Sequence, residues 1–359
     1  MGKPSKGQKL TVGLDLGDRF SQVLVIDARG QVVEEGRVAT REEALRKRFS
    51  GVPPMRIALE TGTHSPWVSR VLEDCGHEVI VANSRKLRLI YENPSKDDRV
   101  DAMYLARLAR VEPALLWPVQ HRGADTQKDL ALLRSRDVLV AARTQLINHA
   151  RGLVKSVGSR LPACSAGSFP KRACEQTPQS LRPALLPVVE EIASLTDRIK
   201  VLDRQIQVLA DQRYPQTRLL RQVGGVGPLT SLAFVLTLEA PERFDKSRMV
   251  GAFLGLVPGR KQSGDSNPQR RITRHGDGYV RRLLVNAAHY VLGPFGPDSD
   301  LRRFGLKIAS RGGKLVKKKA VIAVARKLAV LLHHLWRSAE LYEPLYNQTH
   351  AAGRRAKVA

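Results

Sequence analysis

The chain has 359 residues, of which 42% are hydrophobic, so it is long enough for the packed cores of two or three domains. Its 60 Lys and Arg against 34 Asp and Glu give a net charge of +26, which favours nucleic acid as the partner. No apolar run approaches the about 20 residues of a membrane span, and the opening MGKPSKGQK lacks the apolar core of a secretory signal.

We therefore expect a cytoplasmic protein that associates with nucleic acid and has no membrane partner. The basic surplus is greatest from residue 216 onward, where 26 Lys and Arg face 9 Asp and Glu. The three cysteines, Cys75, Cys164 and Cys174, form no CxxC pair and are expected to be reduced thiols. Their spacing assigns no role to Cys164 or Cys174.

The first predicted elements are three short strands over residues 10–16, 21–28 and 31–38. Their connections are short, so we expect an antiparallel meander. Asp15 interrupts the apolar alternation of the first strand, and a carboxylate there is costly to bury without a cation or donor. The neighbouring glycines leave room for a phosphate or a metal. Asp15 is therefore predicted to be the first ligand of a divalent-metal site that acts on nucleic-acid phosphates.

A helix, a strand, a helix, a strand and a helix are predicted next. The first helix is expected to begin at Thr40, with Glu43 completing a capping box. The later elements are a strand over 56–60, a helix from Ser65-Pro66 to Gly76, a strand over 77–82 and a helix over about 96–111. Three strands followed by this alternation is the element order of an RNase H-like α/β domain.

Three more carboxylates occur at informative places in this domain. Glu60 closes a strand that is expected to neighbour the first strand, and Asp98 and Asp101 share one helix face. Each of these acids, taken alone, could have a purely structural explanation: Glu60 could be a solvated residue at a strand end, and an acid near the start of a helix could interact favourably with the helix dipole. Together with Asp15 they can converge on one or two Mg²⁺ ions, which suit phosphoryl transfer. Asp18 and Asp97 are the nearest alternatives.

The middle of the chain is predicted to be helical. A helix over 126–157 is followed by a Pro-, Ser- and Gly-rich linker over 158–183. A second long helix over 185–212 has apolar residues at near-heptad spacing. This pattern indicates a helical hairpin, an intermolecular coiled coil or an ordinary amphipathic helix.

A glycine-rich turn, Gly224-Gly225-Val226-Gly227, separates two apolar helices and resembles a helix-hairpin-helix. The Gly225 and Gly227 amides could contact a DNA phosphate, although a plain tight turn has the same pattern.

Further on, Ser263 lies in the loop GRKQSGDS. Five basic residues flank it: Arg260, Lys261, Arg270, Arg271 and Arg274. A serine hydroxyl needs activation to be a nucleophile, and clustered arginines could stabilise the charge of a reacting phosphate. Ser266 fits the same reasoning equally well.

Five motifs carry a family resemblance. They are VGLDLGDR, IALETGTHS, SKDDRVDA, GGVGPLTSLA and LGLVPGRKQSGDS…RRITRHGDGYVRRLL. In this order they resemble the DEDD transposases of RNA-guided insertion sequences, also called bridge-RNA or seeker-RNA recombinases. The resemblance covers roughly residues 10–335.

The resemblance implies three parts. Residues 1–157 would form a RuvC-like domain with Asp15, Glu60, Asp98 and Asp101 as the Mg²⁺-binding DEDD set. Residues 158–215 would form a linker and coiled-coil region that mediates assembly. Residues 216–359 would form a mainly α transposase domain with a helix-hairpin-helix-like element and the nucleophile Ser263.

The resemblance also implies a mechanism. The serine would attack the DNA backbone to give a covalent phosphoserine link, and it would meet the metal site of another protomer in a dimer or tetramer. A guide RNA would pair with donor and target DNA. Family members often have an aromatic residue shortly before the serine, whereas Lys261 and Gln262 stand here. The choice between Ser263 and Ser266 therefore stays open.

Three other functions compete with this interpretation. A RuvC-like junction nuclease would use the same carboxylates with a metal-activated water and no covalent step. An actin-like sugar kinase or ATPase would need a second phosphate-gripping turn and an adenosine site, and the sequence places neither correctly. A non-enzymatic nucleic-acid-binding protein would have no need for Asp15 in an apolar strand.

Overall fold

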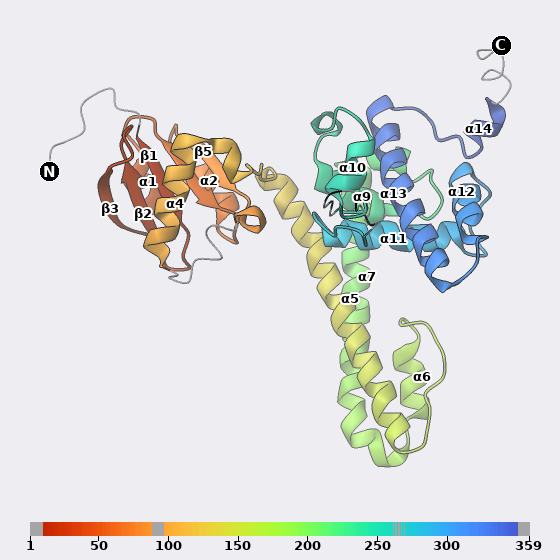
Figure 1. The fold of residues 1–359 in the computed structure, drawn as a ribbon. Helices are drawn as coiled ribbons and strands as arrows, with labels where there is room; N and C mark the ends of the chain where they lie inside the picture. The colour runs from red at the N-terminus through yellow and green to blue at the C-terminus, as the bar shows by residue number, and fades with distance from the viewer. Residues whose placement is uncertain are drawn as a thin grey trace, which may run out of the picture. The chain divides into compact units, whose positions relative to one another are not determined.

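The computed structural model describes residues 10–87, 97–260 and 270–350, together with residues 262, 264, 266 and 268. The chain divides into two compact units, Met1–Ala124 and Asp125–Ala359 (Figure 1). The first unit is shorter than the domain predicted over 1–157, because nearly all of the long helix that begins at Ala124 belongs to the second unit. The division into three parts stays a prediction.

The first unit is built on one five-stranded sheet with the strand order β3-β2-β1-β4-β5. The strands are β1 (Thr11–Asp15), β2 (Phe20–Ile26), β3 (Val32–Ala39), β4 (Arg56–Glu60) and β5 (Glu78–Ala82). The first three strands are antiparallel, whereas β4 and β5 run parallel to β1. The predicted meander and the neighbouring position of Glu60's strand are confirmed. This mixed α/β sheet is compatible with an RNase H-like domain.

Helices cover both faces of the sheet. Helix α1 (Glu42–Phe49) and helix α2 (Ser65–Asp74) share an apolar core with Val12 and Leu14 of β1. Helix α4 (Asp98–Val111) packs on the opposite face. Short 3₁₀ turns, η1 (Ser84–Lys86) and η2 (Pro113–Leu116), follow β5 and α4. Strand alternation therefore decides which side chains point toward α4.

The predicted capping box at Thr40 is wrong. Helix α1 has Arg41 at its N-cap, without a side-chain cap. The hydroxyl of Thr40 instead donates to the Gly17 carbonyl at 2.8 Å and shares a hydrogen bond of 2.8 Å with Ser21. Thr40 thus closes the end of the β-meander, and its hydroxyl is not available to the helix.

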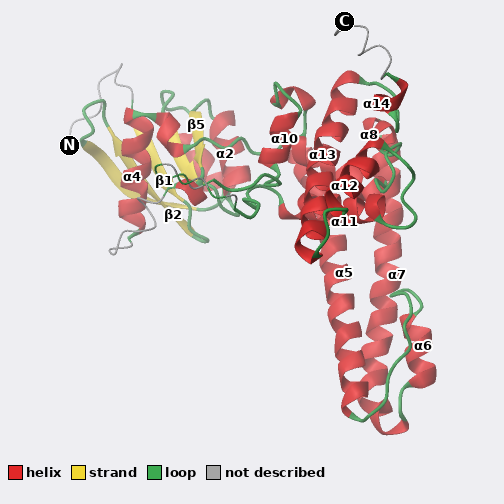
Figure 2. Ribbon diagram, turned by 45° about the vertical axis from the view of Figure 1, so that its right-hand side comes forward, coloured by secondary structure: helices red, strands yellow, loops and turns green. Residues whose placement is uncertain are grey.

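The second unit begins with two long helices, α5 (Ala124–Ser156) and α7 (Arg182–Gln212). Arg136 of α5 pairs with Asp203 of α7 at 2.8 Å, and Arg143 donates to Thr196 at 3.4 Å. The residue number of the partner on α7 falls as the residue number on α5 rises. The two helices are therefore antiparallel, as Figures 1 and 2 show. The apolar seam of 185–212 therefore forms a helical hairpin within one chain.

The linker predicted over 158–183 contains a helix, α6 (Phe169–Gln176), and a 3₁₀ turn, η3 (Gln179–Leu181). Phe169 and Ala173 lie one turn apart and are buried against the hairpin. Pro170 occupies the first turn, where a helix tolerates proline. This apolar pair explains why the proline and glycine content misled the prediction.

Shorter helices surround a common core in the rest of this unit. They are α8 (Gln216–Leu220), α9 (Pro228–Leu238), η4 (Pro241–Arg243), α10 (Arg248–Phe253), α11 (Gly278–Leu292), α12 (Asp300–Ala309), α13 (Lys314–Ser338) and α14 (Tyr346–Thr349). Helix α9 is at the centre, with every residue from Thr230 to Leu238 buried. Among the residues that the structure describes, no helix combines the length and apolarity needed to cross a membrane.

Candidate active site

Asp15 and Glu60 end two adjacent parallel strands. Leu14 of β1 pairs with Leu59 of β4, so the next residue of each strand is an acid at the same carboxyl edge. Neighbouring strands are about 4.8 Å apart. The two backbones therefore bring Asp15 and Glu60 side by side.

Both of these acids point to the face that α4 covers. Gly13 lies directly under α4, because a Cβ added there would overlap the carbonyl oxygen of Ala102. Ala58 on β4 packs against Leu105 of the same helix. Since alternate residues of a strand point to the same face, Asp15 follows Gly13 and Glu60 follows Ala58 toward α4.

Helix α4 brings the other two predicted acids to this edge. Arg56, at the start of β4, donates to the Ala109 carbonyl at 3.1 Å and so anchors the C-terminal end of the helix at the opposite edge. Its first turn consequently lies toward the ends of β1 and β4. Asp101 is only 9% exposed there, and Asp98 lies one turn earlier and is exposed. Topology thus gathers all four acids on one face and at one edge.

The side chains, as they lie, do not form a metal cage. Within the described ranges, no group of three or more His, Cys, Asp or Glu side chains could hold a metal ion. The set nevertheless suits a divalent cation chemically, because all its donors are carboxylate oxygens and Asp101 is buried. The assignment of four ligands stays a prediction.

The two alternative acids have other contacts. Asp97 is the N-cap of α4 and accepts from the Arg99 amide at 3.1 Å. Asp18 lies 3.6 Å from His64 Nε2, and the Trp67 indole donates to Nδ1 of that histidine at 3.1 Å. An open pocket of about 260 Å³ lies here, lined by Leu16, Asp18, Gly62, Thr63 and His64. The sequence reasoning did not single out His64, although it follows Glu60 by only four residues.

The predicted serine loop is closed at its base by a short β-ribbon. Pro258 and Ile272 form an antiparallel bridge, and the Gly259 amide donates to the Arg271 carbonyl at 2.9 Å. A Cβ on Gly276, beyond the ribbon, would overlap the Phe253 carbonyl oxygen. The ribbon and this close packing hold both ends of the loop against α10.

Of the loop's predicted site residues, Ser263 and Lys261 lie outside the described residues. Ser266 is exposed. The four arginines, Arg260, Arg270, Arg271 and Arg274, are also exposed, and none has an ion pair within the described part of the chain. Their charges are therefore available to an anionic ligand.

The glycine turn between α8 and α9 has a structural explanation at one position. Gly225 has a φ of 84°, and a Cβ there would lie 2.9 Å from the Tyr290 ring and 3.0 Å from the Ala287 carbonyl. Gly227 is exposed at the N-cap of α9, with open space around it. Packing against α11 accounts for Gly225, and the phosphate contacts of both glycines stay predictions.

Comparison with known families gives two matches. A transposase model for the DEDD domain of IS110 elements matches residues 12–158, and one described as "Transposase IS116/IS110/IS902 family" matches residues 217–300. The first covers the acidic edge, and the second covers the glycine turn and the serine loop. A DEDD domain implies a divalent metal.

Individual relatives agree with these matches. A probable family 20 transposase of Pseudomonas aeruginosa is 30% identical over 93% of this chain and 98% of its own length. The transposase for insertion sequence element IS1111A of Coxiella burnetii is 29% identical over 70% of each chain. A pilin gene-inverting protein of Moraxella bovis is 26% identical over 66% of this chain and 65% of its own. The chain is a DNA-processing enzyme and belongs to the IS110 family of transposases.

Proposed function

We propose that the protein is an RNA-guided recombinase that moves an insertion sequence by serine attack on the DNA backbone. The main support is that four acids from three separate segments reach one edge of the first unit, within the region that matches the DEDD model. The loop of Ser263 and its arginines lies within the second match. The three-part division of residues 1–157, 158–215 and 216–359 belongs to this proposal.

Asp15, Glu60, Asp98 and Asp101 would hold Mg²⁺, which supplies positive charge to the reacting phosphate. The Ser263 hydroxyl would attack the phosphorus, forming a P–Oγ bond while the bond to one sugar oxygen breaks and that oxygen leaves with a proton. Arg260, Lys261, Arg270, Arg271 and Arg274 would bind the phosphate oxygens. A hydroxyl of the exchanged DNA end would then displace the serine and restore its proton.

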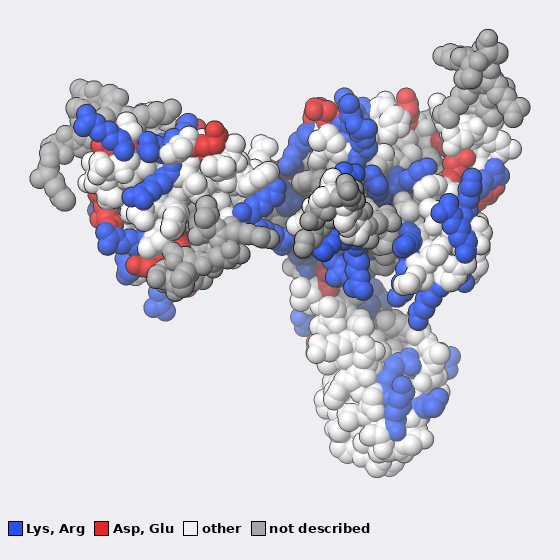
Figure 3. Space-filling model, viewed as in Figure 1, with Lys and Arg blue, Asp and Glu red and all other residues white. Residues whose placement is uncertain are grey.

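The proposed partners are donor DNA, target DNA and a guide RNA, in a dimer that assembles to a tetramer in the bacterial cytoplasm. The metal site and the serine of one reaction would come from different protomers, with residues 158–215 mediating assembly. The Gly225 and Gly227 amides would contact a DNA phosphate from a helix-hairpin-helix-like turn. The charge of +26, and the exposed Lys and Arg in Figure 3, support a polyanionic partner.

Replacing Ser263 with alanine is expected to abolish both recombination and the covalent protein–DNA adduct, because the proposal assigns the phosphoserine link to the Ser263 hydroxyl. The adduct is measured as labelled DNA that migrates with the denatured protein. Ser266→Ala is the matched control and should keep both activities; the reverse pattern would assign Ser266 instead. A RuvC-like junction nuclease is the alternative, and it would cleave with Ser263→Ala and form no adduct with the wild type.

Protein purified from its host is expected to carry one discrete RNA, because a guide must stay bound to select donor and target. Sequencing of the co-purified RNA checks this expectation, with the pool of total cellular RNA as the reference. Fragments in proportion to that pool would contradict RNA guidance, whatever the outcome for the serine.

A further inference from the structure

A row of polar side chains crosses the sheet from the acidic edge to the outermost strand. Asp15 of β1 pairs with Gln22 of β2, and Gln22 pairs with Arg37 of β3. Residues directly opposite each other on neighbouring strands point to the same face. Arg37, Gln22, Asp15 and Glu60 therefore form one row on the face that α4 covers.

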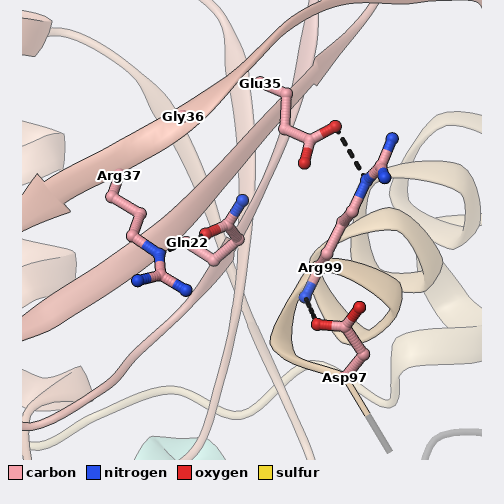
Figure 4. A pocket seen from close by; sticks show the side chains of 6 residues that line it. All are labelled: Gln22, Glu35, Gly36, Arg37, Asp97 and Arg99. Carbon is pink, nitrogen blue, oxygen red and sulfur yellow. Dashed lines mark hydrogen bonds and ion pairs between the residues drawn. The ribbon is translucent and has the colours of Figure 1, made fainter. Parts of the chain in front are cut away.

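The outer end of this row lines an open pocket of about 350 Å³ between β3 and the start of α4 (Figure 4). Its lining residues are Gln22, Glu35, Gly36, Arg37, Asp97 and Arg99. The two acids among them already have partners. Glu35 pairs with the Arg99 guanidinium at 2.8 Å, and Asp97 accepts from the Arg99 amide at 3.1 Å.

Arg37 differs from Arg99 in its contacts. Its Nε donates to the side-chain oxygen of Gln22 at 3.2 Å, which turns the guanidinium toward the row (Figure 4). Within the residues that the structure describes, Arg37 forms no ion pair. A neutral partner orients the group without neutralising it, so its charge remains available to an anion.

We propose that Arg37 binds a backbone phosphate of the DNA strand that is cut at the acidic edge. This inference rests on the proposed function for the location of that edge, and it adds a substrate-binding residue on β3. Two strand spacings separate Arg37 from Asp15, or about 10 Å. With a rise of about 3.4 Å per nucleotide, the contacted phosphate lies within about three nucleotides of the scissile one.

Such a contact would offset the electrostatic repulsion between the acidic edge and the DNA backbone. Four carboxylates at one edge repel the DNA backbone, and bound metal offsets this only next to the acids. A guanidinium matches a phosphate with two parallel N–H donors. β3 is the last strand of the sheet on that side, so a polymer can approach Arg37 without crossing another strand.

The first test measures DNA binding by the full-length protein in EDTA over a series of salt concentrations. Arg37→Ala is expected to bind five- to tenfold more weakly, and its slope of log K against log salt should fall by about one. Arg37→Lys should bind more tightly than Arg37→Ala and more weakly than the wild type, because lysine keeps the positive charge but lacks the two parallel N–H donors of the guanidinium. Arg29→Ala is the matched control, because Arg29 is exposed in the turn between β2 and β3 at the opposite edge.

The second test locates the phosphate. Single neutral methylphosphonate linkages are placed along each strand of the DNA, and the affinity of the wild type and of Arg37→Ala is measured for each. One linkage near the cleavage site should weaken the wild type and leave Arg37→Ala unchanged. The proposal would be overturned if both proteins were equally sensitive to every linkage. It would also be overturned if the slope of log K against log salt were the same for Arg37→Ala as for the wild type.

Neither binding test needs metal or cleavage, so the two proposals can fail separately. If Asp15→Asn kept full cleavage while Arg37→Ala lost one phosphate contact, the metal site would be wrong and the phosphate contact would stand. If Asp15→Asn were inactive and Arg37→Ala bound normally, only the contact would be wrong. Thermal unfolding of each variant confirms that the sheet is intact.

Discussion

Replacing Asp15 with asparagine is expected to slow DNA strand cleavage by about 10³-fold or more. Removal of one preorganised group that stabilises transition-state charge typically costs 10²- to 10³-fold, and the loss of a metal ligand should cost at least as much. Asparagine keeps the shape of the side chain, so the midpoint of thermal unfolding should stay close to that of the wild type. Cleavage of labelled DNA over a range of Mg²⁺ concentrations is the measurement.

Asp18→Asn is the matched control for this experiment. Asp18 lies three residues further along, is 91% exposed and faces His64. Its replacement should leave the cleavage rate within about threefold of the wild type, since a solvated charge contributes little. Full activity in Asp15→Asn, or the larger loss in Asp18→Asn, would refute the ligand assignment.

Replacing Gly13 with alanine is expected to lower the free energy of unfolding of the first unit by about 3 kcal/mol or more. The new methyl group would overlap the carbonyl of Ala102, and neither backbone can yield without moving α4 off the sheet. Asp98 and Asp101 move with that helix, so cleavage should fall as well. Urea denaturation, followed by a probe in the first unit, measures the stability.

Gly36→Ala on β3 provides the comparison, because a Cβ there meets nothing within 4 Å. It should change the unfolding free energy by less than about 1 kcal/mol, through backbone entropy alone. Equal stability of the two variants would show that α4 does not lie against β1 in the way described.

Most of the secondary structure of the first unit could be predicted from local sequence patterns. The alternation of β1 and the short apolar run of β4 gave strands at the right places, and the parallel neighbour of β1 followed from element order. Competing partners defeated the prediction elsewhere. Thr40 is a residue type that often caps a helix, but its hydroxyl donates instead to the Gly17 carbonyl in the meander. Burial of Phe169 against the hairpin stabilises a helix in a segment whose proline content predicted a loop.

The candidate site could be predicted only in part, because some of its residues are brought together by contacts between distant segments. Four acids could be proposed from their positions in strands and on one helix face. The row from Asp15 through Gln22 to Arg37 depends on strand register, which no local pattern in β2 or β3 specifies. Gln22 and Arg37 look like ordinary solvent-facing strand residues until the pairing is known.

The order in which the acids occur along the chain has a consequence for synthesis. Asp15 and Glu60 belong to strands that are synthesised first, whereas Asp98 and Asp101 follow on α4, which ends at Val111. On the proposed assignment, a nascent polypeptide still lacking this helix holds half of its ligands and cannot nick the chromosome. On the same assignment the nucleophile Ser263 is synthesised later still, so a translation product that ends before α4 would lack both the helix that docks on Gly13 and the serine.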